Sequence, residues 1–330
     1  MNFNPVLKTK SRGIKIAVVG SGPSGLSCAA ELCKDGFEVD IFERKPQPGG
    51  MLRYLIPDYR LGKDFLDKEL NDITSLGVNI KCNSSIKSED DLKNLFEEGY
   101  KRIYIATGTW QVESLGLGSD IKGFLNAVEF LEKCKSSEKD EMVKILEDRA
   151  VFVIGGGDTA LDTARTALKF GAGEVSIIYR RSFMQMPGNE KEKIAALKSG
   201  IHFLILTQPV KYLSGEGKIT GIEVVRNKLG DIDPSGRPRP IPVDNSNHTI
   251  DADIIIEAIG LKPDISNKEL FSKLQLSEKG LIIVDDKTGS TSRKNIHAGG
   301  DIIRGPSLIV EAVADGKRAA RAIAKSMELS

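Results

Sequence analysis

The sequence has few cysteines, and none of them forms a Cys-x-x-Cys pair. The four present are Cys28, Cys33, Cys82 and Cys134. This spacing excludes a zinc knuckle and an iron–sulfur cluster, because both need closely spaced thiolate ligands. A chain in a reducing compartment also has no use for structural disulfides. We therefore expect four ordinary thiols and no metal site.

Histidine, net charge and long apolar runs are also scarce. The histidines are His202, His248 and His297, and no pattern of neighbouring residues gives them a catalytic role. Lys and Arg number 47 against 46 Asp and Glu, a net charge of +1 that provides no field to attract nucleic acid or an anionic membrane. The polar segment 1–13 lacks the apolar core of a signal peptide, and no stretch approaches the roughly 18 apolar residues that span a bilayer. We expect a cytoplasmic protein that binds neither nucleic acid nor membrane.

Glycine, by contrast, is abundant, with 33 residues in a chain of 330, a length that suits about two globular domains. A β-branched run over 14–19 predicts a buried parallel strand. It leads into the loop Gly20-Ser21-Gly22-Pro23-Ser24-Gly25, then into a helix over 26–34 and a second strand over 37–42. Such a loop brings backbone N–H groups and a helix N-terminus against a pyrophosphate. The pattern predicts a dinucleotide-binding βαβ unit.

The end of the second strand indicates which group this site binds. Glu43 stands there, where a carboxylate can accept hydrogen bonds from both ribose hydroxyls of an adenosine. Arg44 follows it, and both residues belong to the predicted cofactor site. The alternative is an exposed Glu at a strand end without a ligand.

A second βαβ unit has the loop Gly155-Gly156-Gly157-Asp158-Thr159-Ala160, between a strand over 150–154 and a helix over 160–170. Its second strand, 175–179, ends not on an acid but on Arg180-Arg181. Guanidinium groups pair with a 2′-phosphate, which a carboxylate would repel. The second site is therefore predicted to bind NADPH in preference to NADH. The alternative is that one arginine merely pairs with a surface carboxylate.

Two dinucleotide folds, one with a ribose acid and one with a basic pair, predict two different dinucleotides in one chain. The usual pair is a resident flavin, FAD, with an exchangeable nicotinamide, NADPH. Hydride transfer between them requires alignment and exclusion of water rather than a protein acid or base. We therefore predict an FAD-dependent NADPH oxidoreductase without a catalytic side chain of its own, in agreement with the scarcity of histidine.

The pattern after the second unit predicts the domain organisation. Short strands over 211–253 are typical of a β-meander, and a strand over 253–259 ends the second domain. Strands over 281–284 and 295–298 and a helix over 307–327 are expected to return to the first domain. We predict an α/β chain of two Rossmann-like domains with three ββα layers, the NADP domain inserted into the FAD domain. The expected bounds are 1–119 and 264–330 for the FAD domain and 120–263 for the NADP domain.

Further motifs create a specific resemblance to a known family. They are Gly49-Gly50-Met51-Leu52, Ile56-Pro57-Asp58-Tyr59-Arg60-Leu61, Ala106-Thr107-Gly108, Tyr179-Arg180-Arg181 with Met186-Pro187-Gly188, and Ala298-Gly299-Gly300-Asp301 with Gly305-Pro306-Ser307. With these motifs the chain resembles the FAD and NADPH module of the glutamate synthase small subunit family, from Lys15 to Ala324. That family also includes the electron-input half of dihydropyrimidine dehydrogenase and the large subunit of ferredoxin-dependent transhydrogenase.

The resemblance implies two sets of cofactor-binding residues. Those expected along FAD are Gly50, Met51, Leu52, Arg60, Thr107, Gly108, Gly300, Asp301, Pro306, Ser307 and Leu308. Within this set, Asp301 would accept hydrogen bonds from the ribityl or pyrophosphate region, and 305–308 would present a helix N-terminus to the flavin N1–C2=O edge. Those expected at NADPH are Asp158, Thr159, Ala160, Arg180, Arg181, Ala258, Ile259 and Gly260.

Departures from the family leave the electron acceptor open. Relatives carry a cysteine-rich iron–sulfur domain ahead of the flavin fold, whereas about thirteen residues precede the first strand here, so we expect no such clusters. The missing Cys-x-x-Cys pair and flavin-side disulfide argue against thioredoxin-reductase and glutathione-reductase chemistry. What remains is transfer to a protein partner, such as a large subunit or a ferredoxin-like carrier, or to a small quinone or dye. The alternative from another class is a flavin-binding scaffold or regulatory subunit with little turnover.

Overall fold

The computed structural model describes residues 10–118, 120–233 and 236–328. Residues 1–9 of the polar N-terminus and residue 119, where a domain boundary was expected, lie outside this range. The chain divides into two compact units: unit 1 comprises Met1–Gln111 with Leu261–Ser330, and unit 2 comprises Val112–Gly260. Unit 2 is therefore one continuous segment, flanked by the two segments of unit 1.

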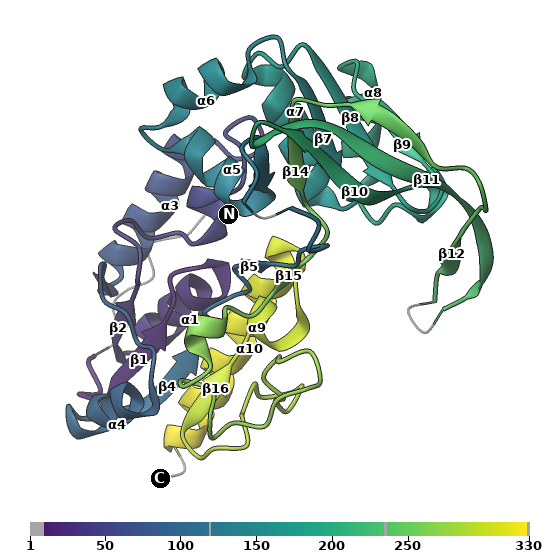
Figure 1. Ribbon diagram of the computed structural model, residues 1–330. Helices are drawn as coiled ribbons and strands as arrows, with labels where there is room; N and C mark the ends of the chain where they lie inside the picture. Colours follow the sequence, from purple (N-terminus) through teal and green to yellow (C-terminus); the bar gives the residue numbers. More distant parts are fainter. Residues whose placement is uncertain (1–9, 119, 234–235, 329–330) are drawn as a thin grey trace. The chain divides into compact units, whose positions relative to one another are not determined.

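Unit 1 is built on a parallel five-stranded sheet in the order β16-β4-β1-β2-β3 (Figure 1). Its strands are β1 (Lys15–Val19), β2 (Glu38–Phe42), β3 (Asn79–Lys81), β4 (Tyr100–Ile105) and β16 (Ile296–Ala298). At the carboxyl end of β1, Val19 pairs with Phe42 of β2 and with Ile105 of β4. This register brings the segments that follow the three strands to one edge of the sheet. The first glycine loop, Glu43 and Ala106 meet there.

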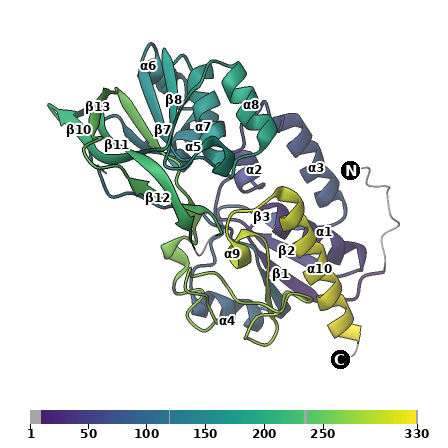
Figure 2. The same cartoon turned by 90° about the vertical axis from the view of Figure 1, so that its right-hand side faces the viewer.

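Two helices lie side by side on one face of this sheet (Figures 1 and 2). α1 (Pro23–Lys34) follows the first glycine loop, and α10 (Ile309–Glu328) contributes to the same apolar cluster, as does α3 (Lys63–Ser75). The approach of α10 to α1 depends on Gly316, because a Cβ there would lie 2.2 Å from the Ser24 carbonyl oxygen. Both the strand and the helix predicted around this loop are present, and the helix begins three residues earlier than expected, at Pro23.

The other face of the sheet is covered by α4 (Glu89–Glu97) and by an irregular segment that contributes Leu270 and Phe271 to a second apolar cluster. Sequence analysis missed α4. The sequence does contain a start signal for this helix, because Ser88 and Asp91 have the spacing of a capping box and form one in the structure.

The strand predicted over 281–284 is wrong. This stretch forms only isolated bridges, Leu276 with Ile282 and Val284 with Thr291. Ile282 is buried, and this burial produces the apolar pattern. Because Ile282 and Val284 pair with different segments, no ladder forms.

Unit 2 repeats the parallel sheet, in the order β6-β14-β7-β8-β9. Its strands are β6 (Phe124–Asn126), β7 (Ala150–Ile154), β8 (Glu174–Tyr179), β9 (His202–Ile205) and β14 (Ile254–Glu257). Its helices are α5 (Ala127–Lys135), α6 (Lys139–Leu146), α7 (Asp158–Lys169) and α8 (Glu190–Lys198). β7, which precedes the second glycine loop, lies between β8 and β14, so the loop has the same position as in unit 1.

An antiparallel sheet forms the third layer of unit 2. Its strands are β10 (Thr207–Gly215), β11 (Lys218–Ile232), β12 (Pro238–Pro242) and β13 (His248–Asp251). Figure 2 shows β10, β11 and β13 on one side of β7 and β8, with α7 and α8 on the other. Phe152 and Ile255 of the parallel sheet pack against Tyr212 and Ile222 of this layer. The prediction of two Rossmann-like folds is confirmed, and the ββα layering is complete in unit 2.

Short elements complete the chain. They are α2 (Met51–Tyr54), β5 (Gln111–Val112), a 3-10 turn (Phe183–Gln185), β15 (Leu261–Lys262), a second 3-10 turn (Ile265–Asn267) and α9 (Asp301–Arg304). The two points where the chain passes between units fall in β5 and next to β15, which pair with each other. Sequence analysis gave no sign of strands this short and expected these divisions at 119/120 and 263/264.

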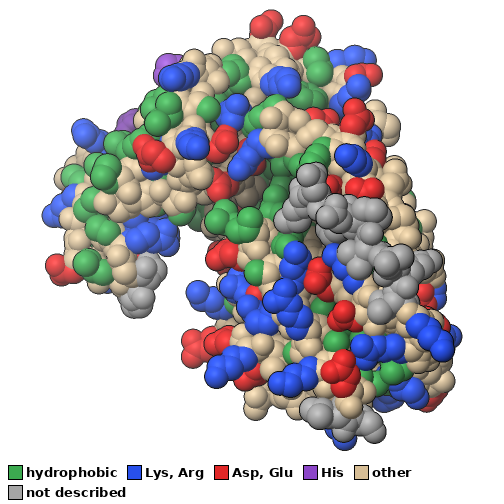
Figure 3. All heavy atoms as spheres, turned by 180° about the vertical axis from the view of Figure 1, so that it is seen from behind, with side chains coloured by type: hydrophobic (Ala, Val, Ile, Leu, Met, Phe, Trp, Pro, Cys, Tyr) green, Lys and Arg blue, Asp and Glu red, His purple; other side chains and the backbone are tan. Residues whose placement is uncertain are grey.

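The surface and the helices agree with the charge and hydropathy of the sequence. Figure 3 shows Lys and Arg side chains interspersed with Asp and Glu on the face that it draws. In the described part of the chain, no helix is long and apolar enough to cross a membrane.

Candidate functional site

Two glycines of the first loop pack against the protein backbone, and a third faces open space. Gly20 has φ 103°, and a Cβ there would lie 2.4 Å from the Ala106 carbonyl oxygen. A Cβ on Gly25 would lie 2.0 Å from the Gly20 carbonyl oxygen. No described atom lies within 4 Å of a Cβ on Gly22. The open face at Gly22, beside the start of α1 at Pro23, fits a pyrophosphate.

Glu43 is buried at the end of β2, and the protein holds its carboxylate in place. Its Oε2 accepts the Ser21 N–H at 3.0 Å and the Ser21 hydroxyl, and its Oε1 accepts the Lys45 N–H at 2.8 Å. Ser21 in turn accepts the Gly49 N–H at 3.0 Å. A carboxylate has about four lone-pair positions, so Glu43 retains acceptor capacity for ribose hydroxyls.

Arg44 is engaged by residues that are distant in the sequence. Its Nη1 lies 2.7 Å from Asp264 Oδ2, and its guanidinium lies over the Trp110 ring at 5.3 Å from the centroid. Lys45 lies over the rings of Tyr54 and Trp110. Sequence analysis placed Arg44 in the site but could not find Trp110 or Asp264, because neither belongs to a motif.

The predicted flavin-side motifs gather around the first loop. A Cβ on Gly50, whose φ is 55°, would lie 2.8 Å from the Gly22 Cα, so the segment that leads into Met51 and Leu52 touches the loop. The buried Thr107 Oγ1 has no hydrogen-bond partner among the described residues. Such an orphaned hydroxyl fits a polar ligand.

Two further members of the predicted set lie in turns. Gly108 has a left-handed φ of 68° and follows Thr107 directly. Arg60 lies in a turn that its own N–H closes on the Pro57 carbonyl at 2.9 Å.

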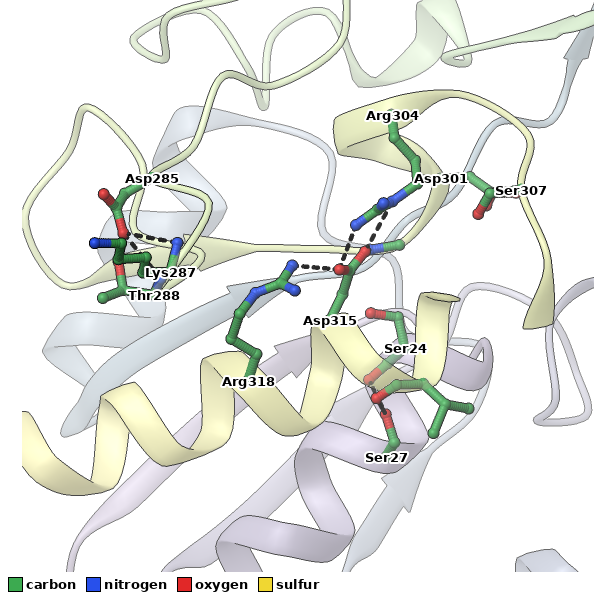
Figure 4. A network of polar contacts seen from close by, with 12 residues as sticks. Ser24, Ser27, Asp285, Lys287, Thr288, Asp301, Arg304, Ser307, Asp315 and Arg318 are labelled. Carbon is green, nitrogen blue, oxygen red and sulfur yellow. Dashed lines mark hydrogen bonds and ion pairs between the residues drawn. The ribbon is translucent and has the colours of Figure 1, made fainter. Parts of the chain in front are cut away.

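Asp301 begins the short helix α9, immediately after Gly300. Its Oδ1 accepts the Ser307 hydroxyl at 3.0 Å, and burial raises the pKa of its carboxyl. Pro306 and Leu308 flank Ser307, and Leu308 is 59% exposed although it is apolar. Leu308 donates its N–H to Glu311 at 3.0 Å at the start of α10. The Ser307 hydroxyl thus ties the segment after α9 back to the first residue of that helix (Figure 4).

The second loop repeats the geometry of the first. Gly155 has φ 145°, and a Cβ there would lie 2.2 Å from the Ala258 carbonyl oxygen. A Cβ on Gly156 would lie 2.6 Å from the Tyr179 ring. No described atom lies within 4 Å of a Cβ on Gly157, so this loop also presents an open face.

The residues that follow these glycines begin α7. Asp158 accepts the Asn189 N–H at 2.8 Å, which ties the second loop to the segment ahead of α8. Thr159 comes next, and Ala160 is fully buried.

The two arginines after β8 have different environments. Arg180 is exposed, and its guanidinium has no partner among the described residues. Arg181 is 3% exposed, its Nη2 lies 2.6 Å from Asp233 Oδ2, and its Nε donates to the Pro238 carbonyl at 2.8 Å. Asn227 donates to the Arg180 carbonyl at 3.0 Å. Arg181 thus anchors the β11–β12 hairpin. This matches the alternative that one of the two arginines pairs with a carboxylate.

Three residues of the predicted NADPH set follow β14 directly. Ala258 lies beside the loop, Ile259 joins the core of unit 2, and Gly260 accepts the Glu113 N–H at 3.0 Å. Glu257, one residue earlier, is 1% exposed and accepts the Tyr212 hydroxyl at 2.7 Å. Sequence analysis missed Glu257, because its partner Tyr212 is distant in the sequence and belongs to no motif.

The cysteines and histidines take no part in these arrangements. None of the four cysteines forms a disulfide bond, and three of them are buried. Within the described ranges no group of three or more His, Cys, Asp or Glu side chains could hold a metal ion. His297 is buried on β16, and burial lowers its pKa to about 4.

Comparison with known proteins identifies the family. Residues 14–316 match the family described as pyridine nucleotide-disulphide oxidoreductase. The chain belongs to this family. It is an oxidoreductase, and the predicted cofactor pair, FAD with NADPH, is confirmed.

Relatives confirm the resemblance to glutamate synthase small subunits. Over 343 residues the chain is 35% identical to the small chain of NADPH glutamate synthase of Escherichia coli K12, covering 100% of this chain and 72% of that one. Over 319 residues it is 39% identical to subunit beta of the NADP(+)-dependent formate dehydrogenase of Moorella thermoacetica, covering 94% of this chain and 43% of that one. The chain therefore spans less than half of that formate dehydrogenase subunit.

Solved structures show the same fold. Mycobacterium tuberculosis FprA in complex with NADPH superposes with a TM-score of 0.79 at 21% identity, covering 96% of this chain and 85% of that one. Thioredoxin reductase of T. acidophilum gives a TM-score of 0.72 at 21% identity, with 96% and 98% covered.

Proposed function

We propose that unit 1 binds FAD, that unit 2 binds NADPH, and that electrons pass from NADPH through FAD to a partner protein. The observation that carries this proposal is the contrast between two equivalent strand ends. Glu43 lies buried at the end of β2, and Arg180 lies exposed at the end of β8. Carboxylate oxygens suit ribose hydroxyls, and a guanidinium group suits a 2′-phosphate.

In unit 1, the open face at Gly22 and the N-terminus of α1 would hold the pyrophosphate. Glu43 would accept the ribose hydroxyls, and Thr107 and Asp301 would contact the polar chain towards the flavin. The exposed side chain of Leu308 would cover part of the apolar ring. Bound FAD supplies the hydride acceptor, and the protein supplies alignment and exclusion of water.

In unit 2, Gly157 would admit the pyrophosphate of NADPH and Arg180 would pair with the 2′-phosphate. In this proposal Arg180 is the residue that contacts the phosphate, and the buried Arg181 supports it. Arg181 would keep the strand end in place through Asp233 and the Pro238 carbonyl.

The acceptor is proposed to be another protein, a large subunit or a ferredoxin-like carrier. Both relatives described above are named as a chain or subunit of an enzyme, which supports a partner. Because this chain corresponds to only 43% of one of them, the reaction of the whole assembly is part of the proposal. A cytoplasmic location is also part of the proposal, because none of the four cysteines forms a disulfide bond.

Anaerobic mixing with NADPH tests the proposal. The purified protein should be yellow and should lose its flavin absorbance on adding NADPH, and NADH should act much more weakly. A flavin-replete protein that NADPH fails to bleach would favour the scaffold alternative. A protein that binds no FAD would overturn the assignment of unit 1.

A further inference from the structure

Asp315 of α10 is a buried carboxylate that the proposed cofactor contacts leave unexplained. It is 2% exposed and lies against the turn formed by Gly300 and α9 (Figure 4). Its Oδ2 accepts the Gly300 N–H at 3.0 Å and Arg304 Nε at 3.1 Å. Its Oδ1 accepts hydrogen bonds from Arg304 and Arg318. A carboxylate buried so deeply is stable only with such partners, and two of the three belong to the turn that carries Asp301.

We propose that Asp315 is a positioning residue for FAD, which acts by fixing the turn that presents Asp301. The inference rests on the FAD site proposed for unit 1. Gly300 has φ 78°, and a Cβ there would lie 2.9 Å from the Ser24 Cβ, so the turn lies directly on α1. The Gly300 N–H held by Asp315 sets the orientation of the backbone that leads into Asp301.

The helix that carries Asp315 is itself fixed to α1. Gly316 lies on Ser24 and Ser27, since a Cβ there would be 2.2 Å from an oxygen of each. The Ser27 hydroxyl lies between two acceptors that share its single proton, the Ser24 carbonyl at 3.0 Å and the Val313 carbonyl at 3.1 Å. Asp315 therefore connects the turn that carries Asp301 to α10, and Gly316 connects α10 to α1, the helix that follows the first glycine loop. The first glycine loop and the turn that carries Asp301, which are far apart in sequence, are thus joined through α1 and α10.

The competing explanation is that Asp315 only stabilises α10 through its ion pair with Arg318, three residues along the same helix. The two arginines separate these explanations. Arg304 belongs to the turn, so Arg304→Gln should weaken FAD binding if Asp315 acts through the turn. Arg318 belongs to α10, so Arg318→Gln should leave FAD affinity close to that of the wild type.

The test is FAD titration of full-length apoprotein, followed by the fluorescence of Trp110, the single tryptophan of the chain. Asp315→Asn should raise the dissociation constant for FAD about ten- to a hundredfold, the effect of losing charge-assisted hydrogen bonds. The double variant with Asp301→Ala should bind no more weakly than Asp301→Ala alone, because Asp315 acts through Asp301. Glu257→Gln is the matched control, since it neutralises an equally buried carboxylate in unit 2.

Three results would overturn the inference: wild-type FAD affinity in Asp315→Asn, additive losses in the double variant, or equal losses in Arg318→Gln and Arg304→Gln. If Asp315→Asn fails to fold, the comparison of the two arginine variants decides. A wild-type protein that binds no FAD contradicts the proposed function instead, so the two failures are distinguishable.

Discussion

The two glycine loops occupy equivalent places in their units, and they share two features of backbone geometry. Each begins with a left-handed glycine, Gly20 or Gly155, whose missing Cβ faces a carbonyl oxygen of the neighbouring strand end. Each places an unobstructed glycine two residues later, Gly22 or Gly157. Both features suit a pyrophosphate, which the two dinucleotides have in common.

The loops differ at the positions that meet the second strand. Ser21 fixes Glu43 by two hydrogen bonds, whereas Gly156 packs on the Tyr179 ring and leaves Arg180 exposed. Two similar loops thus lie beside strand ends of opposite charge, Glu43 in unit 1 and Arg180 in unit 2. The proposed function therefore assigns selectivity to the strand ends rather than to the glycines.

The largest effect is expected where the first loop meets α1. Gly25→Ala would place a Cβ 2.0 Å from the Gly20 carbonyl oxygen, so both loop and helix must shift. We expect a loss of more than about 3 kcal/mol in the free energy of unfolding, beyond the usual range of single substitutions. Thermal unfolding of the variant measures it, and an unchanged Tm would contradict the packing described here.

Gly22→Ala is the matched control in the same loop. Its Cβ meets open space and its backbone, with φ −68° and ψ 176°, suits alanine, so the fold should persist. The flavin absorbance should be lost, because the methyl group occupies the place of the pyrophosphate.

The two units should also differ in their response to acid. His297 is buried in unit 1, where burial lowers its pKa from 6.5 to about 4, whereas His202 and His248 of unit 2 are exposed. Below pH 6.5 the unfolded chain takes up a proton at His297 that the folded chain refuses until about pH 4. Stability contributed by neutral His297 is therefore present above pH 6.5 and falls by up to about 3 kcal/mol as the pH drops to 4.

Acid should consequently weaken unit 1 through His297, whereas both histidines of unit 2 are exposed. Trp110 fluorescence reports on unit 1, while far-UV circular dichroism reports on both units. His297→Gln should move the Trp110 transition to lower pH. Coincident transitions in the wild type, unaffected by this substitution, would show that the units do not differ in this way.

A smaller, selective effect is expected at the second strand end of unit 2. Arg180→Ala should raise the Michaelis constant for NADPH about ten- to a hundredfold, because a charge-assisted hydrogen bond contributes about 1.5–3 kcal/mol. NADH kinetics and flavin content should stay nearly unchanged. Steady-state rates with both nucleotides and an artificial acceptor measure this, and equal losses with NADH would assign Arg180 a structural role.

Asp233→Asn determines the role of Arg181 by the sign of its effect. If Arg181 supports the strand end, breaking its ion pair should weaken NADPH binding or lower stability. Improved NADPH binding would mean that Asp233 withholds Arg181 from the phosphate.

Motifs formed by neighbouring residues could be predicted, and contacts between distant segments could not. Glu43 and the glycine loops follow from strand–loop–helix order, because the βαβ unit brings them together by itself. The burial of Arg181 depends on Asp233 and Pro238, which only a later hairpin brings to β8. Asp315 was missed for the same reason, since its partner Gly300 reaches it through a turn that no local pattern predicts.

The smallest effect is expected at the position where the first loop has glycine and the second loop has alanine. Ala160 corresponds to Gly25, but its Cβ is accommodated, and it lies 3.3 Å from where a Cβ on Gly155 would stand. Ala160→Gly removes a fully buried methyl group and loosens the first turn of α7, at a cost of about 1 kcal/mol. The Michaelis constant for NADPH should hardly change, because Gly157 and Arg180 are untouched. Chemical denaturation with NADPH kinetics measures both quantities, and a more stable variant would mean that α7 approaches its loop as closely as α1 does.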